Sequence, residues 1–170
     1  MLQKCTLIKV LEVFFVEPTT IHFVKEISKR IKLAPTSVRN HIKWLLKNNL
    51  IKREKAKPFA GFVANRDCED FIFYKRVYNL YSLKELAEFL VSSLYPKVLV
   101  VYGSYVIGED TEWSDIDIFI LSKTKKELDL KRFESKLKRK IHLLTVDNLS
   151  KLDKNMLKKI YNGIVLYGGF

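Results

Sequence analysis

The residues best suited to chemistry lie in one stretch, VVYGSYVIGEDTEWSDIDIFIL, which spans 100–121. An unbroken apolar run of the kind found in buried strands, Val98–Tyr102, leads directly into Gly103 and Ser104. Glycine allows a phosphate to approach the backbone closely. The Ser104 hydroxyl and the amides that follow it can donate hydrogen bonds to phosphate oxygens. The pair is therefore suited to holding a phosphate group.

Two aspartates follow at the start of a second apolar strand. Asp115 and Asp117 are two residues apart, so on a strand their carboxylates leave the same face. Ile116, Ile118 and Ile120 then face the core on the opposite side. Mg²⁺ takes few protein oxygens and keeps its other positions for water and substrate phosphates. The two carboxylates therefore predict a Mg²⁺ site.

This arrangement resembles the nucleotidyltransferase superfamily that includes DNA polymerase beta, and most closely its minimal, single-domain members. The resemblance covers residues 82–168. It implies that Gly103 and Ser104 hold the triphosphate of an NTP, with ATP the expected one. It also implies that Asp115 and Asp117 are catalytic residues that chelate one or two Mg²⁺ ions. The metals would position an acceptor hydroxyl for attack on the α-phosphate and neutralise charge on the departing pyrophosphate.

The sequence departs from the family pattern at two places. Family members often carry a small residue and an arginine before the second glycine of this loop, but here Val106 and Ile107 precede Gly108. They also place a third carboxylate on a later strand, and the matching strand, 140–146, has His142 there. A neutral imidazole can accept a proton but is a poor Mg²⁺ ligand.

Three other carboxylates could replace the missing one, Glu109, Glu112 and Asp147, but none is expected in the middle of a strand. If the strand of His142 lies beside the strand of the aspartates, the imidazole should reach the acceptor and act as a general base. The alternative for His142 is a partly buried, hydrogen-bonded structural histidine. Trp113 likewise has two interpretations, stacking on a base or plain loop packing.

Composition excludes some classes of protein. The chain has 170 residues, 48% of them hydrophobic, and no 18-residue apolar run, so we expect no membrane span. Lys9, Glu12 and Glu17 interrupt the apolar N-terminal stretch, which predicts a core helix of a cytoplasmic protein rather than a signal peptide. The two cysteines, Cys5 and Cys68, have no metal-ligand spacing and are expected to be reduced thiols.

Charge is distributed unevenly along the chain. Residues 1–68 hold 14 Lys/Arg and 5 Asp/Glu, a net of +9, whereas residues 69–170 hold 17 and 14, a net of +3. A small segment at +9 indicates a polyanionic partner, because basic side chains release counterions from phosphate backbones. Solubility alone, or the Lys-rich residue usage of a heat-adapted or AT-rich organism, is the alternative explanation.

The basic segment predicts three helices, near 4–16, 21–31 and 35–47, with Thr20 as the N-cap of the second. A strand-like piece at 50–55, a turn at 57–61 and a return strand at 62–65 follow. This layout resembles a winged helix-turn-helix domain, chiefly through VKEISKRIKLAPTSVRNHIKWLLKNNLIKRE. Three-helix units also serve as protein-interaction modules, which stays open as an alternative.

The resemblance to a winged helix implies binding of double-stranded DNA. Arg39 and Lys43 would enter the major groove, where arginine can pair bidentately with guanine, and the wing would contact phosphates. Winged-helix proteins often dimerise to bind two half-sites, so we expect a homodimer. The expected DNA-binding residues on the third helix and the wing are Thr36, Ser37, Arg39, Asn40, Lys43, Lys52, Arg53, Lys55 and Lys57.

The expected fold class is α+β, with three domains or segments along the chain. Residues 1–68 form the winged helix-turn-helix domain, with three helices and a β-hairpin wing. Residues 69–94 form a helical connector, and residues 95–170 a small mixed-sheet nucleotidyltransferase domain with flanking helices. Within the last, 123–140 is expected to be a charged helix and 164–168 a final strand.

Two functions remain open. The first is a Mg²⁺-dependent nucleotidyltransferase coupled to a DNA-binding winged helix. Minimal members of the resembled family include antitoxins that modify a partner toxin with AMP, so a protein hydroxyl is a plausible acceptor. The second is a DNA-binding transcriptional regulator whose nucleotidyltransferase domain binds nucleotide without turnover. His142 and Ile107 favour the second function, and the intact Gly-Ser and Asp-x-Asp pairs favour the first.

Overall fold

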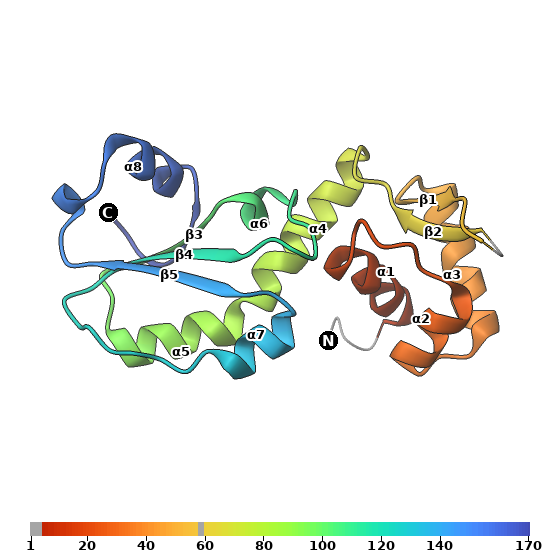
Figure 1. The fold of residues 1–170 in the computed structure, drawn as a ribbon, viewed down its shortest axis with the longest axis horizontal. Coiled ribbons are helices and arrows are strands. Elements are labelled where there is room, and N and C mark those ends of the chain that lie inside the picture. The colour runs from red at the N-terminus through yellow and green to blue at the C-terminus, as the bar shows by residue number, and fades with distance from the viewer. Residues whose placement is uncertain (1–4, 58–59) are drawn as a thin grey trace. The chain divides into compact units, whose positions relative to one another are not determined.

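The computed structural model describes residues 5–57 and 60–170 and divides into two compact units, Met1–Lys75 and Arg76–Phe170 (Figure 1). The division falls within α4 (Glu69–Ser82), and each unit has its own sheet. The mixture of helices and sheets confirms the predicted α+β class. None of the helices in the described ranges is long and apolar enough to cross a membrane.

Three helices pack against one another in the N-terminal unit: α1 (Thr6–Val16), α2 (Val24–Ile31) and α3 (Pro35–Lys47). Pro35 stands in the first turn of α3, where its missing N–H costs no hydrogen bond. The buried residues of the three helices are apolar: Val10, Leu11, Val13, Phe14, Phe15, Ile27, Val38, Ile42 and Leu45. Two predicted features fall partly outside the described residues, the helix start at Lys4 and the turn that contains Pro58 and Phe59.

An antiparallel hairpin follows α3, formed by β1 (Ile51–Glu54) and β2 (Gly61–Ala64). His22 forms an isolated bridge with Phe62, and their backbone N–H groups donate to each other's carbonyls at 2.8 and 2.9 Å. Because this pairing keeps His22 extended, α2 begins only after Phe23. The prediction that Thr20 is the N-cap of this helix is therefore wrong.

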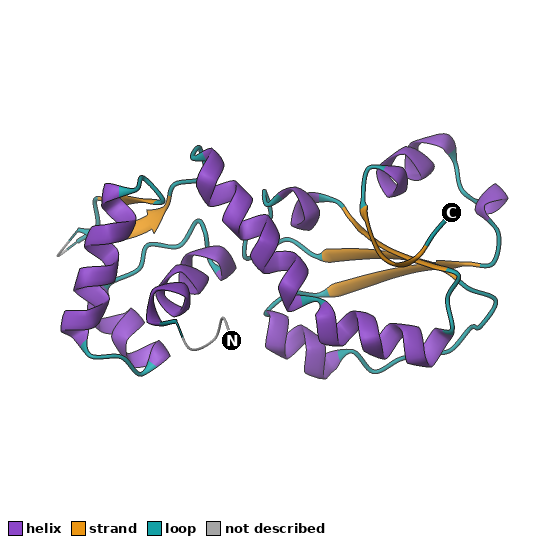
Figure 2. Cartoon of the chain, turned by 180° about the vertical axis from the view of Figure 1, so that it is seen from behind, coloured by secondary structure: helices purple, strands orange, loops and turns teal. Residues whose placement is uncertain are grey.

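The C-terminal unit is built on a four-stranded sheet with strand order β5-β4-β3-β6 (Figure 2). The strands are β3 (Val98–Tyr102), β4 (Ile116–Leu121), β5 (Ile141–Val146) and β6 (Ile164–Gly168). β3 is antiparallel to β4 and β6, and β4 is parallel to β5, so the sheet is mixed as predicted. The carboxyl end of β3 and the amino ends of β4 and β5 therefore meet at one end of the sheet.

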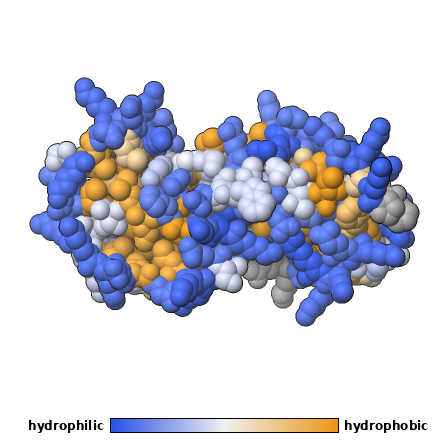
Figure 3. Space-filling view, in the orientation of Figure 1, coloured by the Kyte–Doolittle hydropathy of each residue, from blue (hydrophilic) through white to orange (hydrophobic). Residues whose placement is uncertain are grey.

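Helices cover both faces of this sheet. Leu86 and Leu90 of α5 (Lys84–Leu94) and Phe133 of α7 (Lys131–Leu137) pack on one face. Ile160 of α8 (Lys154–Tyr161) packs on the other, with η2 (Leu149–Lys151) preceding it, and Phe119 lies beside Ile160. On the face seen in Figure 3, the C-terminal unit shows an apolar area bordered by hydrophilic side chains.

The predicted helix over 123–140 is wrong in length, because only Lys131–Leu137 is helical. The Asp129 carboxylate accepts the Lys131 N–H at 3.0 Å and so fixes the helix start. Lys138 has φ +54° and ends the helix. Three apolar residues of this segment, Leu128, Phe133 and Leu137, nevertheless all pack in the core.

Candidate active site

Gly103 lies where β3 ends, directly against the Asp117 carboxylate. Tyr102, the last residue of β3, is opposite Asp117 in the β3–β4 register. Gly103 has φ +82°, in the region that favours glycine, and a β-carbon there would stand 2.9 Å from Asp117 Oδ2. The positive φ, together with the close approach of this carboxylate, therefore favours glycine at position 103.

Ser104 begins α6 (Ser104–Ile107), a single turn that follows Gly103. Gly103 is exposed and Ser104 is half-buried, so both can be reached from solvent. Gly108, with φ +77°, ends the turn and starts the loop that returns to β4. The structure thus places the two residues predicted to contact phosphate at the open end of the sheet, next to Asp117.

The two aspartates flank a buried isoleucine. Ile116 is fully buried in the core, Asp115 immediately before it is exposed, and the Asp117 side chain is 36% exposed. Within residues 5–57 and 60–170, no group of three His, Cys, Asp or Glu side chains is close enough to hold a metal ion. The two predicted metal ligands, Asp115 and Asp117, thus lie on either side of Ile116 and are both accessible to solvent.

His142 lies beside Asp117 on the neighbouring strand. The parallel register of β4 and β5 pairs the two residues, and His142 Nδ1 is 3.5 Å from Asp117 Oδ1. The imidazole is 66% exposed, so it is not a buried structural histidine. Burial, and secondarily the Asp117 charge, raises the pKa of the Tyr102 hydroxyl, which keeps that neighbour neutral.

Asp147 does not complete this site. It follows β5 and forms an ion pair with Lys151 at 2.6 Å, and the hydrogen bond from Lys151 lowers the pKa of Asp147. The other two candidates, Glu109 and Glu112, lie in the loop before β4. The structure therefore leaves His142 as the residue paired with Asp117 on β5.

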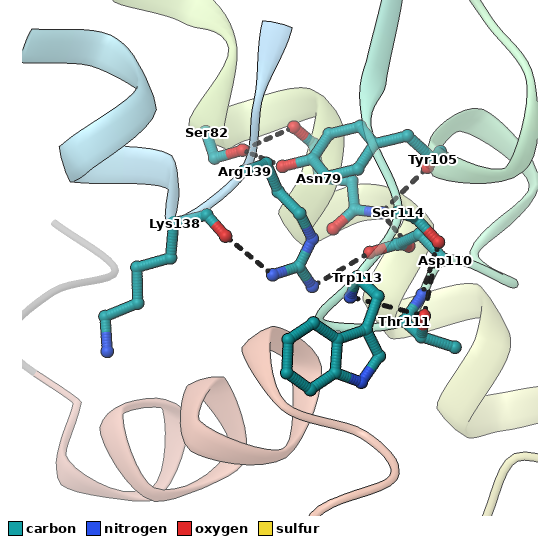
Figure 4. A network of polar contacts seen from close by, with 9 residues as sticks. All are labelled: Asn79, Ser82, Tyr105, Asp110, Thr111, Trp113, Ser114, Lys138 and Arg139. Atoms are coloured by element: carbon teal, nitrogen blue, oxygen red, sulfur yellow. Dashed lines mark hydrogen bonds and ion pairs between the residues drawn. The ribbon is translucent and has the colours of Figure 1, made fainter. Parts of the chain in front are cut away.

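A buried polar network was not predicted from the sequence (Figure 4). Asp110, 1% exposed, accepts hydrogen bonds from Asn79 Nδ2 at 2.8 Å and from an Arg139 guanidinium nitrogen at 3.3 Å. Asn79 also donates to the Tyr105 carbonyl at 2.7 Å, and Ser82 Oγ lies 2.9 Å from the Tyr105 hydroxyl. These residues come from segments far apart in the chain, so no local pattern could have found them.

A hollow of about 340 Å³ opens beside Asp115. Its lining includes Trp113, which is 87% exposed, and two residues beyond α7, Lys138 and Lys140. A larger hollow of about 520 Å³ lies between α5 and α7, lined in part by Phe89 and Phe133, and includes none of the predicted site residues. The smaller hollow adjoins the predicted site, because Asp115 forms part of its wall.

The predicted DNA-binding residues lie on α3 and around the hairpin of the N-terminal unit. All of them are exposed except Ser37, which is half-buried. Lys52 forms an ion pair with Asp67, and the hydrogen bond from Lys52 lowers the pKa of Asp67. The charge of Lys52 is therefore partly balanced within the unit.

Comparison with known proteins identifies one part of the chain. Residues 83–166 match the family model described as a nucleotidyltransferase domain. The match contains the ends of β3, β4 and β5 with Gly103, Asp115, Asp117 and His142. The residues of the N-terminal unit lie outside the matched range. A comparison with curated proteins gives no match.

Proposed function

We propose that the nucleotidyltransferase domain at residues 83–166 transfers a nucleoside monophosphate from an NTP, preferentially ATP, to a hydroxyl acceptor in a Mg²⁺-dependent reaction. Transfer of a nucleoside monophosphate is the general activity of such domains, which use an NTP and a divalent metal. The main support for the proposal is that the Gly103 backbone, the Asp117 carboxylate and the His142 imidazole lie close together at one end of the sheet.

The donor set at this end of the sheet fits Mg²⁺. Asp115 and Asp117 provide carboxylate oxygens, the ligands that Mg²⁺ prefers, and both are accessible to solvent. A bound Mg²⁺ would neutralise phosphate charge and orient the acceptor hydroxyl. Two protein ligands suffice for such a role, because Mg²⁺ usually keeps several waters and substrate oxygens.

Gly103 and Ser104 would hold the triphosphate. Without a side chain at Gly103, a phosphate can come close to the backbone next to Asp117. The Ser104 hydroxyl and the N–H groups of Ser104 and Tyr105, at the start of the α6 turn, can donate to its oxygens. Ile107 lies 44% exposed on the same turn and provides no cation for the phosphates.

His142 would act as the general base. Its ring can take the proton of the acceptor hydroxyl while the Asp117 carboxylate, 3.5 Å away, stabilises the imidazolium that forms. Histidine suits this role near neutral pH because its charge changes between about pH 5 and 8. The acceptor would approach through the hollow beside Asp115, and a protein hydroxyl, such as one on a partner toxin, is the acceptor we favour.

The N-terminal unit would direct this domain to double-stranded DNA as a winged helix-turn-helix. Three packed helices, a two-stranded hairpin and the net charge of +9 over residues 1–68 support this proposal. Arg39 and Lys43 on α3 would contact bases, and the basic residues of the hairpin would contact phosphates. A homodimer would place two such units on two half-sites.

One observation favours a second function, a DNA-binding regulator that binds nucleotide without turnover. At the position where the resembled family has a third carboxylate, the structure has a histidine that faces Asp117. An imidazole cannot provide the negative charge that a second Mg²⁺ needs. In this alternative the NTP acts as a signal, and no bond is broken.

Incubation with labelled ATP, GTP, CTP or UTP and Mg²⁺ tests both functions. Release of pyrophosphate or labelling of protein by the wild type, and neither by Asp117→Asn, supports transfer. An increase in melting temperature with NTP and Mg²⁺ but no transfer supports the regulator, because a ligand that binds the folded state stabilises it. A wild type that shows neither response at millimolar NTP contradicts both.

A further inference from the structure

The loop that carries Asp115 is fixed at several points. It runs from Gly108 to β4, and Asp110 within it is almost completely buried. Between Asp110 and Asp115 the chain forms a closed turn, in which the Thr111 N–H donates to Ser114 Oγ at 2.9 Å and the Ser114 N–H donates to the Thr111 carbonyl at 3.1 Å. The backbone between the buried Asp110 carboxylate and the exposed Asp115 carboxylate is therefore held by hydrogen bonds.

One short segment before β5 holds this loop on both sides of Asp115. Upstream of Asp115, Arg139 pairs with Asp110 at 3.3 Å, and their side chains are 3% and 1% exposed. Downstream, the Ile116 N–H donates to the Lys140 carbonyl at 2.8 Å. The same segment continues into β5 and reaches His142. The Asp110–Arg139 contact (Figure 4) therefore links the positions of Asp115 and His142.

A stability argument does not account for this ion pair. Removing two charges from water is costly, and well-packed apolar residues of similar volume are often as stable or more stable. The pair does have directional hydrogen bonds, because the Arg139 guanidinium also donates to the Lys138 carbonyl at 3.0 Å and Asp110 also accepts from Asn79. These hydrogen bonds connect α4, the loop that carries Asp115 and the segment just before β5.

We propose that Asp110 and Arg139 are positioning residues, which hold Asp115 in the geometry that metal binding and transfer require. The proposal rests on the function given above for Asp115. Neither residue is a proposed metal ligand or base, although Arg139 also lines the hollow beside Asp115, and both act through the loop. A small displacement of a group at a reaction centre costs about 100-fold in rate, so the contribution of the pair should be large in activity and small in stability.

The test replaces both charges with apolar groups of similar size, Asp110→Leu/Arg139→Met, in a Trp44→Phe background. Trp113 is then the only tryptophan and can sensitise luminescence of Tb³⁺ bound near Asp115. We expect a melting temperature close to that of the wild type, Tb³⁺ affinity lowered about tenfold or more, and kcat lowered about 10- to 100-fold. The control Glu85→Gln/Lys136→Met removes an exposed ion pair between α5 and α7 in the same unit. It should change neither the Tb³⁺ affinity nor kcat.

Arg139→Lys is the second variant, needed if the apolar pair fails to fold. Lysine keeps the charge balance, but it lacks the planar fork that lets Arg139 donate to Asp110 and Lys138 at once. We expect a folded protein with reduced Tb³⁺ affinity. Either folded variant with the Tb³⁺ affinity of the wild type overturns the proposal, as does a wild type that binds no Tb³⁺. If the wild type binds Tb³⁺ but transfers nothing, transfer fails, and the Tb³⁺ titration alone decides the positioning role.

Discussion

The two units of the chain arrange their polar side chains in different ways. The N-terminal unit has many basic residues, exposed and spread over α3 and the hairpin, within a segment of net charge +9. The C-terminal unit places a few groups within a few ångströms of one another, where β3 ends and β4 and β5 begin. His142 Nδ1 and Asp117 Oδ1, for example, are 3.5 Å apart. Spread charges attract a polyanion additively, whereas a reaction needs exact placement of a few atoms.

This difference predicts how each unit tolerates substitution. Loss of one surface cation removes one of many similar contacts, so binding should weaken in steps. Loss of one group at the end of the sheet should abolish a function almost completely, because the contributions of groups that act together in one reaction are not additive.

The largest effect is expected for Asp117→Asn. The substitution keeps the shape of the side chain but removes the charge next to Gly103 and His142. We expect transfer to fall about 1000-fold, as when a principal transition-state stabiliser is removed, and the Mg²⁺-dependent increase in melting temperature to disappear. The melting temperature without ligand should stay close to that of the wild type. A rate within threefold of wild type would contradict the metal role of Asp117.

The next effect is expected for His142→Ala, which distinguishes the two proposed functions. If His142 is the base, the substitution should lower transfer about 100-fold, because the acceptor hydroxyl loses the group that takes its proton. The control His142→Asp restores the family's third carboxylate. Activity that appears only in His142→Asp would favour the regulator, and equal rates for wild type and His142→Ala would exclude His142 from catalysis.

Much of the site was predictable because its parts are close in sequence or alternate on strands. A strand, Gly103-Ser104, a loop and Asp115-x-Asp117 form one local pattern, and the structure brings Gly103 and Asp117 together. The resemblance pointed to His142, and the β4–β5 register places it opposite Asp117.

The rest depended on contacts between distant residues. Asp110 and Arg139 are 29 positions apart and meet only because β4 and β5 pair. The N-cap of α2 was wrongly assigned to Thr20 because His22 pairs with Phe62, a contact that hydrophobic periodicity along the helix does not encode. Tertiary pairing overrode the local pattern in both cases.

A smaller effect is expected in the N-terminal unit, for Arg39→Ala/Lys43→Ala. Both side chains are exposed on α3, and each base contact is worth a modest discrimination. We expect affinity for a fragment of the protein's own promoter to fall about 10- to 100-fold, measured by fluorescence anisotropy at fixed salt. Lys25→Ala/Lys29→Ala on α2 removes the same charge from exposed positions and is the matched control. Equal losses in both double variants would mean that charge alone, and not the α3 face, determines binding.

The smallest effect is expected for Tyr105→Phe in the buried network of the C-terminal unit, and it depends on pH. Burial raises the pKa of Tyr105 to about 12 from an ordinary value of 10.0, and its hydroxyl lies 2.9 Å from Ser82 Oγ. Below about pH 10 both folded and unfolded chains keep the proton, so the hydrogen bond should make the wild type slightly more stable.

Above that pH the unfolded chain releases the proton of Tyr105 first, which favours unfolding, and wild-type stability falls as the pH rises towards 12. Phenylalanine has no proton to lose. The difference in melting temperature between wild type and Tyr105→Phe should therefore shrink between about pH 8 and about pH 11. A difference that stays constant over this range would show that Tyr105 is not held protonated by its buried surroundings.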